Sequence, residues 1–238
     1  MTAQADDMVV CETALLKFDD LIRVEVGQGD ERIVFPVFAS ILTTRSKFFE
    51  KALSDGWKEA EDRVVKLPEV DLSVFNLYLH HVLSGDFPVV AKNTPSECLD
   101  LNIYLGLSER LQLSRLYILA ELLQDTTTKN KTLKAFIASI FKIRQRRFFM
   151  PDSQAIRVIY EGTPPESPMR RLLVDSHAAY GKNDYISSHV FEEWPKEFLY
   201  EFAVRVLADR AAPSVHAIHE ARNDGGLVDI ETEEEKTT

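Results

Sequence analysis

Residues 20–53 read DLIRVEVGQGDERIVFPVFASILTTRSKFFEKAL, and residues 64–85 read VVKLPEVDLSVFNLYLHHVLSG. These two segments predict a strand, a turn, a strand, two short helices, a strand and a helix. The expected bounds are Asp20–Val26, Gly27–Asp30, Glu31–Val37, Ala39–Leu53, Arg63–Leu67 and Asp71–Leu83. Strands therefore come first and helical patterns follow, an order that indicates the α+β class rather than alternating α/β.

The strand predictions rest on a period of two. Apolar and charged residues alternate through residues 22–26, which is typical of a strand with one buried face. Residues 27–30 read GQGD, a turn composition with two glycines that tolerate positive φ. The alternation resumes at residues 33–37, so the two strands are expected to form a hairpin.

The helix predictions rest on end signals and apolar spacing. Ser46 is a good N-cap for a short helix, and Asp71 is one for the clearest helix of the sequence. Gly85 is expected to end that second helix. Its apolar residues are spaced to form one broad face against the sheet, namely Phe75, Tyr78, Leu79, Val82 and Leu83.

The rest of the sequence predicts helices only. A loop is expected at residues 86–95, followed by a helical hairpin made of Ser96–Leu105 and Ser114–Gln124. Further helices are expected around Leu133–Phe141, at Asp152–Tyr160, at Pro168–Tyr180, and from Pro195 with Phe198, Phe202, Ala203, Val206 and Leu207 on one face.

The order and spacing of several short motifs resemble the BTB/POZ domain, from about Phe18 to Gln124. The residues that carry the resemblance are Asp20, Phe35-Pro36-Val37, Ser46-Lys47-Phe48-Phe49, Leu67-Pro68-Glu69, Phe75–Gly85 and the segment LYILAELLQDTTTKN at 116–130. Residues 56–59 and 156–175 look like the version common in filamentous fungi. The resemblance implies an α+β fold with a small sheet and a helical cluster, followed by an all-α C-terminal extension.

Four segments follow from this reading. Residues 1–17 form an N-terminal segment expected to be flexible, residues 18–125 the BTB/POZ-like domain, and residues 126–210 the helical extension. Residues 211–238 form an acidic tail, expected to be disordered because it has few apolar residues. Residues 223–238 contain six acids and one lysine, half of the net charge of −10. The body is therefore only mildly acidic, which disfavours direct nucleic-acid binding.

Family members bind other proteins and carry no active site, so the resemblance implies a non-enzymatic protein–protein interaction module without cofactors. One form of such a module is a substrate adaptor, which brings substrates to a cullin ubiquitin ligase. The alternative function is that of a transcription- or chromatin-associated regulator. The expected partner surface includes the exposed side of helix 71–84, the following loop and the helical hairpin, with Leu83, Asp86, Phe87 and Tyr104 as candidates. Self-association is left open.

The sequence departs from the family pattern at three polar positions. Phe38 and Ala39 replace the family's histidine and basic residue, so the charged pair with Asp20 that lines a strand-swapped dimer cannot form. Asp86 stands where cullin-binding members often carry a glutamate. The framework residues of the fold are thus better matched than the groups used for dimer and cullin contacts.

Chemical motifs are weak by comparison. Gly27-Gln28-Gly29 lacks the third glycine and the Lys-Ser/Thr of a phosphate loop, so the turn interpretation is favoured. His216 and His219 have helical zinc spacing but no further ligand nearby, so no metal site is predicted.

The two cysteines indicate a reducing compartment, and no apolar run is long enough to span a bilayer. The expected location is cytoplasmic, nuclear or both. Lys142, Arg144, Arg146 and Arg147 form the one basic cluster, interpreted first as a solvated helix end and second as an import signal.

Overall fold

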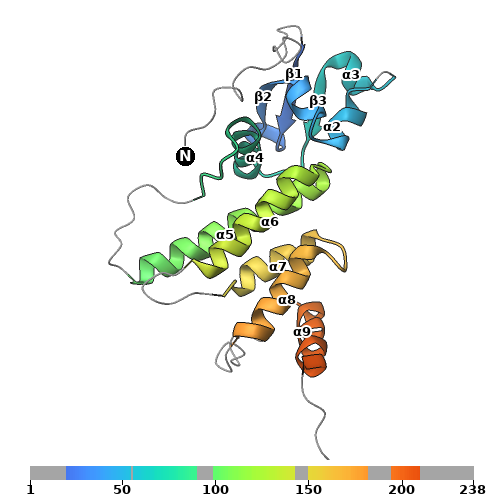
Figure 1. Ribbon diagram of the computed structural model, residues 1–238. Helices are drawn as coiled ribbons and strands as arrows, with labels where there is room; N and C mark the ends of the chain where they lie inside the picture. Colours follow the sequence, from blue (N-terminus) through green and yellow to red (C-terminus); the bar gives the residue numbers. More distant parts are fainter. Residues whose placement is uncertain (1–19, 55, 90–98, 143–149, 182–193, 210–238) are drawn as a thin grey trace, which may run out of the picture.

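The computed structural model describes residues 20–54, 56–89, 99–142, 150–181 and 194–209, with residues 99–106 described by their backbone only (Figure 1). Within these ranges the protein is α+β, with a three-stranded mixed sheet and a majority of helices. Figure 1 shows three tiers: the sheet with α1–α4, the paired helices α5 and α6, and the group α7–α9.

The sheet has the order β2-β1-β3. β1 (Leu21–Val26) pairs antiparallel with β2 (Ile33–Phe38), which confirms the predicted hairpin, and pairs parallel with β3 (Val64–Leu67). Ile22, Val24 and Val26 are buried, as their alternation predicted. The connection between β1 and β2 contains the 3-10 turn η4 (Gly29–Glu31). Because β1 is central, its buried face anchors the first tier.

The end signals predicted at Ser46, Asp71 and Gly85 are confirmed. Ser46 caps α2 (Lys47–Ala52), its hydroxyl accepting from the Phe49 N–H at 3.2 Å. Asp71 caps α4 (Leu72–Ser84) by accepting from two backbone N–H groups, and Gly85 ends α4 with φ of +83°. Two further short helices are α1 (Ala39–Thr43), which was predicted, and α3 (Lys58–Asp62), which was not.

The apolar face of α4 differs from its prediction. Phe75, Tyr78 and Leu79 are buried, but Val82 is only partly buried and Leu83 is 66% exposed. Burial also extends around the helix to Val74, Leu77 and His81. The reason is that α4 lies between the sheet and α5, so two of its sides are covered while its last turn extends beyond them.

The helical hairpin predicted for 96–124 is wrong, because the described part of this segment is the single helix α5 (Leu99–Leu122). α5 packs against α4, α6 (Thr126–Phe141) and α7 (Ser153–Gly162). Contact with α7 is close at Gly162, where an added Cβ would lie 2.4 Å from Cδ1 of Ile118. α5 therefore belongs to the cores of both the first and the third tiers.

A polar cluster, here called the Asp125 cluster, joins the first tier to the turn between α5 and α6. Asp125 is fully buried and caps α6, accepting from the Thr128 N–H at 2.8 Å. Its Oδ2 accepts from Tyr78 Oη at 3.2 Å, Thr128 Oγ1 at 2.7 Å and Arg45 Nε at 3.3 Å. Burial, reinforced by Asp125, raises the pKa of Tyr78 well above its ordinary value. The Asp125 cluster thus pairs a buried carboxylate with a partly buried arginine, and Tyr78 and Thr128 donate to the same carboxylate.

The C-terminal helices are α7, α8 (Pro168–Tyr180) and α9 (Lys196–Asp209), and α9 packs against α8 and α7. The face predicted for α9 is only partly buried: Phe198 is in the core and Phe202 is partly covered, whereas Ala203, Val206 and Leu207 are exposed. The reason is that α8 and α7 cover only one side of α9.

Candidate functional site

The predicted partner residues gather at the C-terminal end of α4. Leu83 and Asp86 are exposed, and Phe87 is partly buried. Gly85 in the left-handed conformation turns the backbone here, and the Asp86 N–H donates to Ser84 Oγ at 3.1 Å. The structure therefore brings Leu83, Asp86 and Phe87 to one exposed turn, called the α4 end surface below.

Phe87 is held in place by a buried histidine. Its ring stacks on His81, with centroids 4.1 Å apart and planes 6° from parallel. Neither ring nitrogen of His81 has a hydrogen-bond partner in the described part of the protein. Burial, with smaller contributions from Arg45 and Lys131, lowers the pKa of His81, although the Asp86 backbone acts in the opposite direction. A neutral imidazole thus supports the α4 end surface.

The other candidates are placed only in part. Tyr104 lies in α5, but its side chain is outside the described residues. Lys142 is exposed, with its Nζ 3.8 Å from Glu109 Oε2, whereas Arg144, Arg146 and Arg147 fall outside the described residues. The import signal therefore stays a prediction.

Asp20 is described, and its carboxylate serves the fold. Its Oδ2 accepts from the Ser40 N–H at 2.7 Å, at the beginning of α1. Ala39, which directly precedes Ser40 in the sequence, is buried in the core. Asp20 thus stabilises a helix start, where backbone N–H groups have no partner within the helix.

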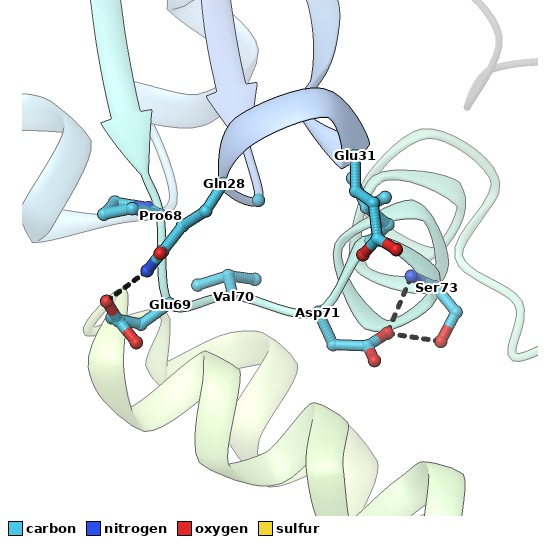
Figure 2. A pocket seen from close by; sticks show the side chains of 9 residues that line it. Gln28, Glu31, Pro68, Glu69, Val70, Asp71 and Ser73 are labelled. Carbon is cyan, nitrogen blue, oxygen red and sulfur yellow. Dashed lines mark hydrogen bonds between the residues drawn. The ribbon is translucent and has the colours of Figure 1, made fainter.

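A cleft of about 590 Å³ lies where the ends of β1 and β3 meet the start of α4 (Figure 2). The two parallel strands end side by side, and the Gly27 N–H donates to the Leu67 carbonyl at 3.1 Å. The lining residues are Gly27, Gln28, Glu31, Pro68, Glu69, Val70, Asp71, Leu72 and Ser73. The cleft is thus built from the two loops that follow parallel strands.

The electrostatics of this cleft are acidic. Figure 2 shows Glu31 facing the side of Asp71 and Ser73, while Gln28 Nε2 donates to Glu69 Oε1 at 2.6 Å. The hydrogen bond from the Ser73 hydroxyl lowers the pKa of Asp71, and the backbone N–H groups of Ser73 and Val74 lower it further. Burial of the carboxylate acts in the opposite direction but does not cancel these effects. Among the described residues, three carboxylates and no basic group line the cleft, a charge distribution that disfavours phosphate. This agrees with the turn interpretation of residues 27–30.

No group of three or more potential metal ligands occurs in the described ranges, and His216 and His219 lie outside them. His80 is exposed and His81 is buried, so these adjacent histidines point apart. None of the described helices is long and apolar enough to cross a membrane.

Sequence reasoning missed an exposed apolar stripe on α9. Tyr200, Val204 and Leu207 are 71%, 50% and 63% exposed, and their spacing of four and three residues puts them on one helix face. The signal was present, because α9 carries apolar residues on two faces where one face suffices for the core. The α9 stripe consists of these three residues.

Comparison with known proteins adds no relatives: no family model matches the sequence, and no curated protein matches it.

Proposed function

We propose that this protein is a non-catalytic protein–protein interaction module, made of a BTB/POZ-like domain and a helical C-terminal extension. The order β1, β2, α1, α2, β3 and α4 supports the proposal, because apart from the additional short helix α3 between α2 and β3 it is the order expected for the BTB/POZ-like segment. The central β1 and the burial of α4 on two sides are what such a compact sheet-and-helix unit requires.

The observation that carries the interaction role is the α9 stripe. Large apolar side chains at positions i, i+4 and i+7 on an exposed helix are the anchors with which a helix enters a groove of another protein. Single exposed apolar residues are ordinary, but a contiguous row marks a contact surface. The α9 stripe is therefore proposed to contact a partner protein.

In the enzyme-linked version of the proposal, the protein is a substrate adaptor of a cullin ubiquitin ligase. The α4 end surface then faces the scaffold, with Leu83 as the apolar contact and Asp86 as its acidic neighbour. The α9 stripe is free to hold the substrate, because the two surfaces lie on different elements.

The interaction role is tested by affinity capture with the full-length protein and a Val204→Glu, Leu207→Glu double variant, followed by quantitative mass spectrometry. Partners of the α9 stripe are expected to fall at least tenfold with the double variant, because two buried charges would oppose the contact. Arg171→Glu, an exposed change on α8, is the control and should leave capture unchanged. An identical partner set for all three proteins would contradict the proposal.

The adaptor version is tested separately, with a purified cullin N-terminal domain and size-exclusion chromatography. A complex with the wild-type protein, lost on Leu83→Glu, is the expected result. No complex at tens of micromolar would remove the adaptor version and leave the interaction role standing. Capture of chromatin proteins instead would favour the regulator alternative, whose candidate import arginines lie outside the described residues.

A further inference from the structure

A second cleft, of about 700 Å³, lies where the end of α7, the loop before α8 and the start of α9 meet. It is remote in sequence from the α4 end surface and is not needed by the proposed function. The residues lining it are Arg157, Tyr160, Glu161, Pro165, Arg170, Trp194, Pro195 and Glu197. This cleft is called the Arg170 cleft.

Arg170 is the fixed polar group of the cleft. The residue is only 7% exposed, and its Nε donates to Thr163 Oγ1 at 3.1 Å. Its Nη2 donates to the carbonyls of Tyr160, at 2.6 Å, and of Thr163. The guanidinium also lies over the Tyr160 ring, 4.4 Å from the centroid. These contacts leave the guanidinium no freedom to swing into solvent.

The charge of Arg170 lacks an ionic partner. All of its acceptors are carbonyl or hydroxyl oxygens, and no carboxylate of a described residue forms an ion pair with it. The carbonyl end of α7 supplies only about half a negative charge. Buried guanidinium groups are normally paired, because burying a charge without a partner is unfavourable.

Donors are also left over on the lining. Nη1 of Arg170 makes no hydrogen bond to a described residue, so its two N–H groups are left to donate to an acceptor in the cleft. The indole N–H of Trp194 is buried and likewise has no partner among the described residues. The lining therefore has donors left over, and the Arg170 guanidinium contacts no carboxylate of a described residue.

We propose that the Arg170 cleft binds a carboxylate group of a peptide, with Arg170 as its counter-ion. Tyr160, Pro165, Trp194 and Pro195 supply apolar walls for the side chain that neighbours the carboxylate. A carboxylate can accept a charge-assisted hydrogen bond from Nη1, and its single charge compensates the single charge of Arg170.

The remaining charges of the cleft set its selectivity. Glu161, Glu197 and Arg157 are exposed, and together with Arg170 they give the lining two negative and two positive charges. A doubly charged phosphate would be repelled by the two glutamates, whereas a singly charged carboxylate flanked by neutral amides is accepted. Both the C-terminus of a peptide and an isolated acidic side group present such a carboxylate.

The experiment uses the full-length protein with Trp57→Phe, which leaves Trp194 as the only tryptophan. Trp194 fluorescence is followed during titration with N-acetyl-leucine, with N-acetyl-leucinamide, and with a C-terminally amidated peptide that contains one glutamate. We expect saturable binding of N-acetyl-leucine and no response to the neutral amide. Binding of the glutamate peptide as well would assign acidic side groups as a source, and its failure would assign the peptide C-terminus.

Two variants separate binding from a structural role of Arg170. Arg170→Lys should weaken N-acetyl-leucine binding by roughly tenfold or more, because the charged N–H donors of Nη1 are lost from this position. Glu197→Gln should strengthen the binding by about twofold to fivefold, an effect that a purely structural arginine does not predict. Circular dichroism checks that each variant is folded.

Three results would overturn the proposal. The first is an equal response to N-acetyl-leucine and its amide, and the second is no saturable response to either carboxylate probe. The third is displacement of N-acetyl-leucine by inorganic phosphate at similar concentration, which would show that the cleft does not select carboxylates. If Glu197→Gln bound N-acetyl-leucine with the same affinity as the wild type, the carboxylate of the ligand would not lie near Glu197 in this cleft.

Discussion

Arg45 in the N-terminal region and Arg170 in the C-terminal region are both drawn out of solvent, but their surroundings differ. Arg45 meets the buried carboxylate of Asp125, and Tyr78 and Thr128 complete the Asp125 cluster. Arg170 is more deeply buried and meets only carbonyl and hydroxyl oxygens. The N-terminal region thus pairs Arg45 with a carboxylate of its own. In the C-terminal region, Arg170 lies beside a cleft and pairs with no carboxylate of a described residue.

The difference separates a structural role from a binding role. A cluster in which each buried charge has a partner needs no ligand, and it specifies how α4, α5 and α6 join. We infer that an arginine that lines a cleft and has no counter-ion among the described residues can accept an anion from outside. Each of the following changes tests one side of this comparison.

Asp125→Ala is expected to have the largest effect. It leaves Arg45 and Tyr78 without their shared acceptor and removes the N-cap of α6, so the free energy of unfolding should fall by about 3–5 kcal/mol. Urea denaturation followed by circular dichroism measures the change. Asp175→Ala, which breaks an exposed pair with Arg205, is the control and should leave the unfolding midpoint nearly unchanged.

Gly162→Ala tests the contact that joins α7 to α5. The new methyl group would overlap the Ile118 side chain, so we expect a loss of about 1–3 kcal/mol in the free energy of unfolding. The double variant with Ile118→Val should recover part of that loss, since it removes one of the overlapping carbons. A double variant no more stable than Gly162→Ala would show that the backbone, not Ile118, absorbs the overlap.

We expect acid to lower the free energy of unfolding through two buried histidines, His81 in the N-terminal region and His177 in the C-terminal region. Burial lowers the pKa of His81 and of His177, although hydrogen bonds to the Leu173 and Pro151 carbonyls oppose this at His177. The unfolded protein takes up these protons near pH 6.5 and the folded protein only at lower pH. Stability is therefore fully present above that pH and declines as the pH falls below it, by at most about 1.4 kcal/mol per pH unit for one group.

His81→Leu isolates the N-terminal share of this acid effect. Denaturation midpoints at pH 7 and pH 5 should lie closer together in the variant than in the wild type. The variant should also keep most of its stability at pH 7, because neither His81 nitrogen has a hydrogen bond to a described residue to lose. A difference between the two midpoints equal to that of the wild type would assign the acid sensitivity to other groups.

Gly85→Ala should have the smallest effect, a loss of about 1 kcal/mol in the free energy of unfolding. Its φ of +83° disfavours any residue with a Cβ, while no atom lies within 4 Å of the added group. The change sits at the α4 end surface, so binding of N-acetyl-leucine to the Arg170 cleft should not change. Altered affinity would mean that the two regions are coupled.

Much of the fold could be predicted because its signals are local. The alternation at residues 22–26, the caps at Ser46 and Asp71, and the glycine at 85 each act within a few residues. Helix α5 was wrongly divided because residues 106–112 include a glycine and several polar residues. A glycine inside a helix costs only about 1 kcal/mol, and packing against three other helices outweighs it.

The Arg170 cleft could not be predicted, since its walls come from three helices and the burial of an arginine depends on what packs around it. One signal was nevertheless readable. Arg170 precedes Leu173, Val174 and His177 by three, four and seven residues, which places it on the buried stripe of α8. An arginine at a position that the apolar spacing assigns to the core indicates a buried charge that needs a partner.

Helix α5 has a practical consequence for anyone who divides the protein into pieces. Its buried residues, among them Leu116 and Leu119, belong to a core that continues from β1 to α9. A fragment that ends at residue 125 would keep α5 but strip α6 and α7 from its sides, exposing apolar surface to water. The two regions should therefore melt in one cooperative transition, and expression of either alone should yield aggregates instead of a folded domain.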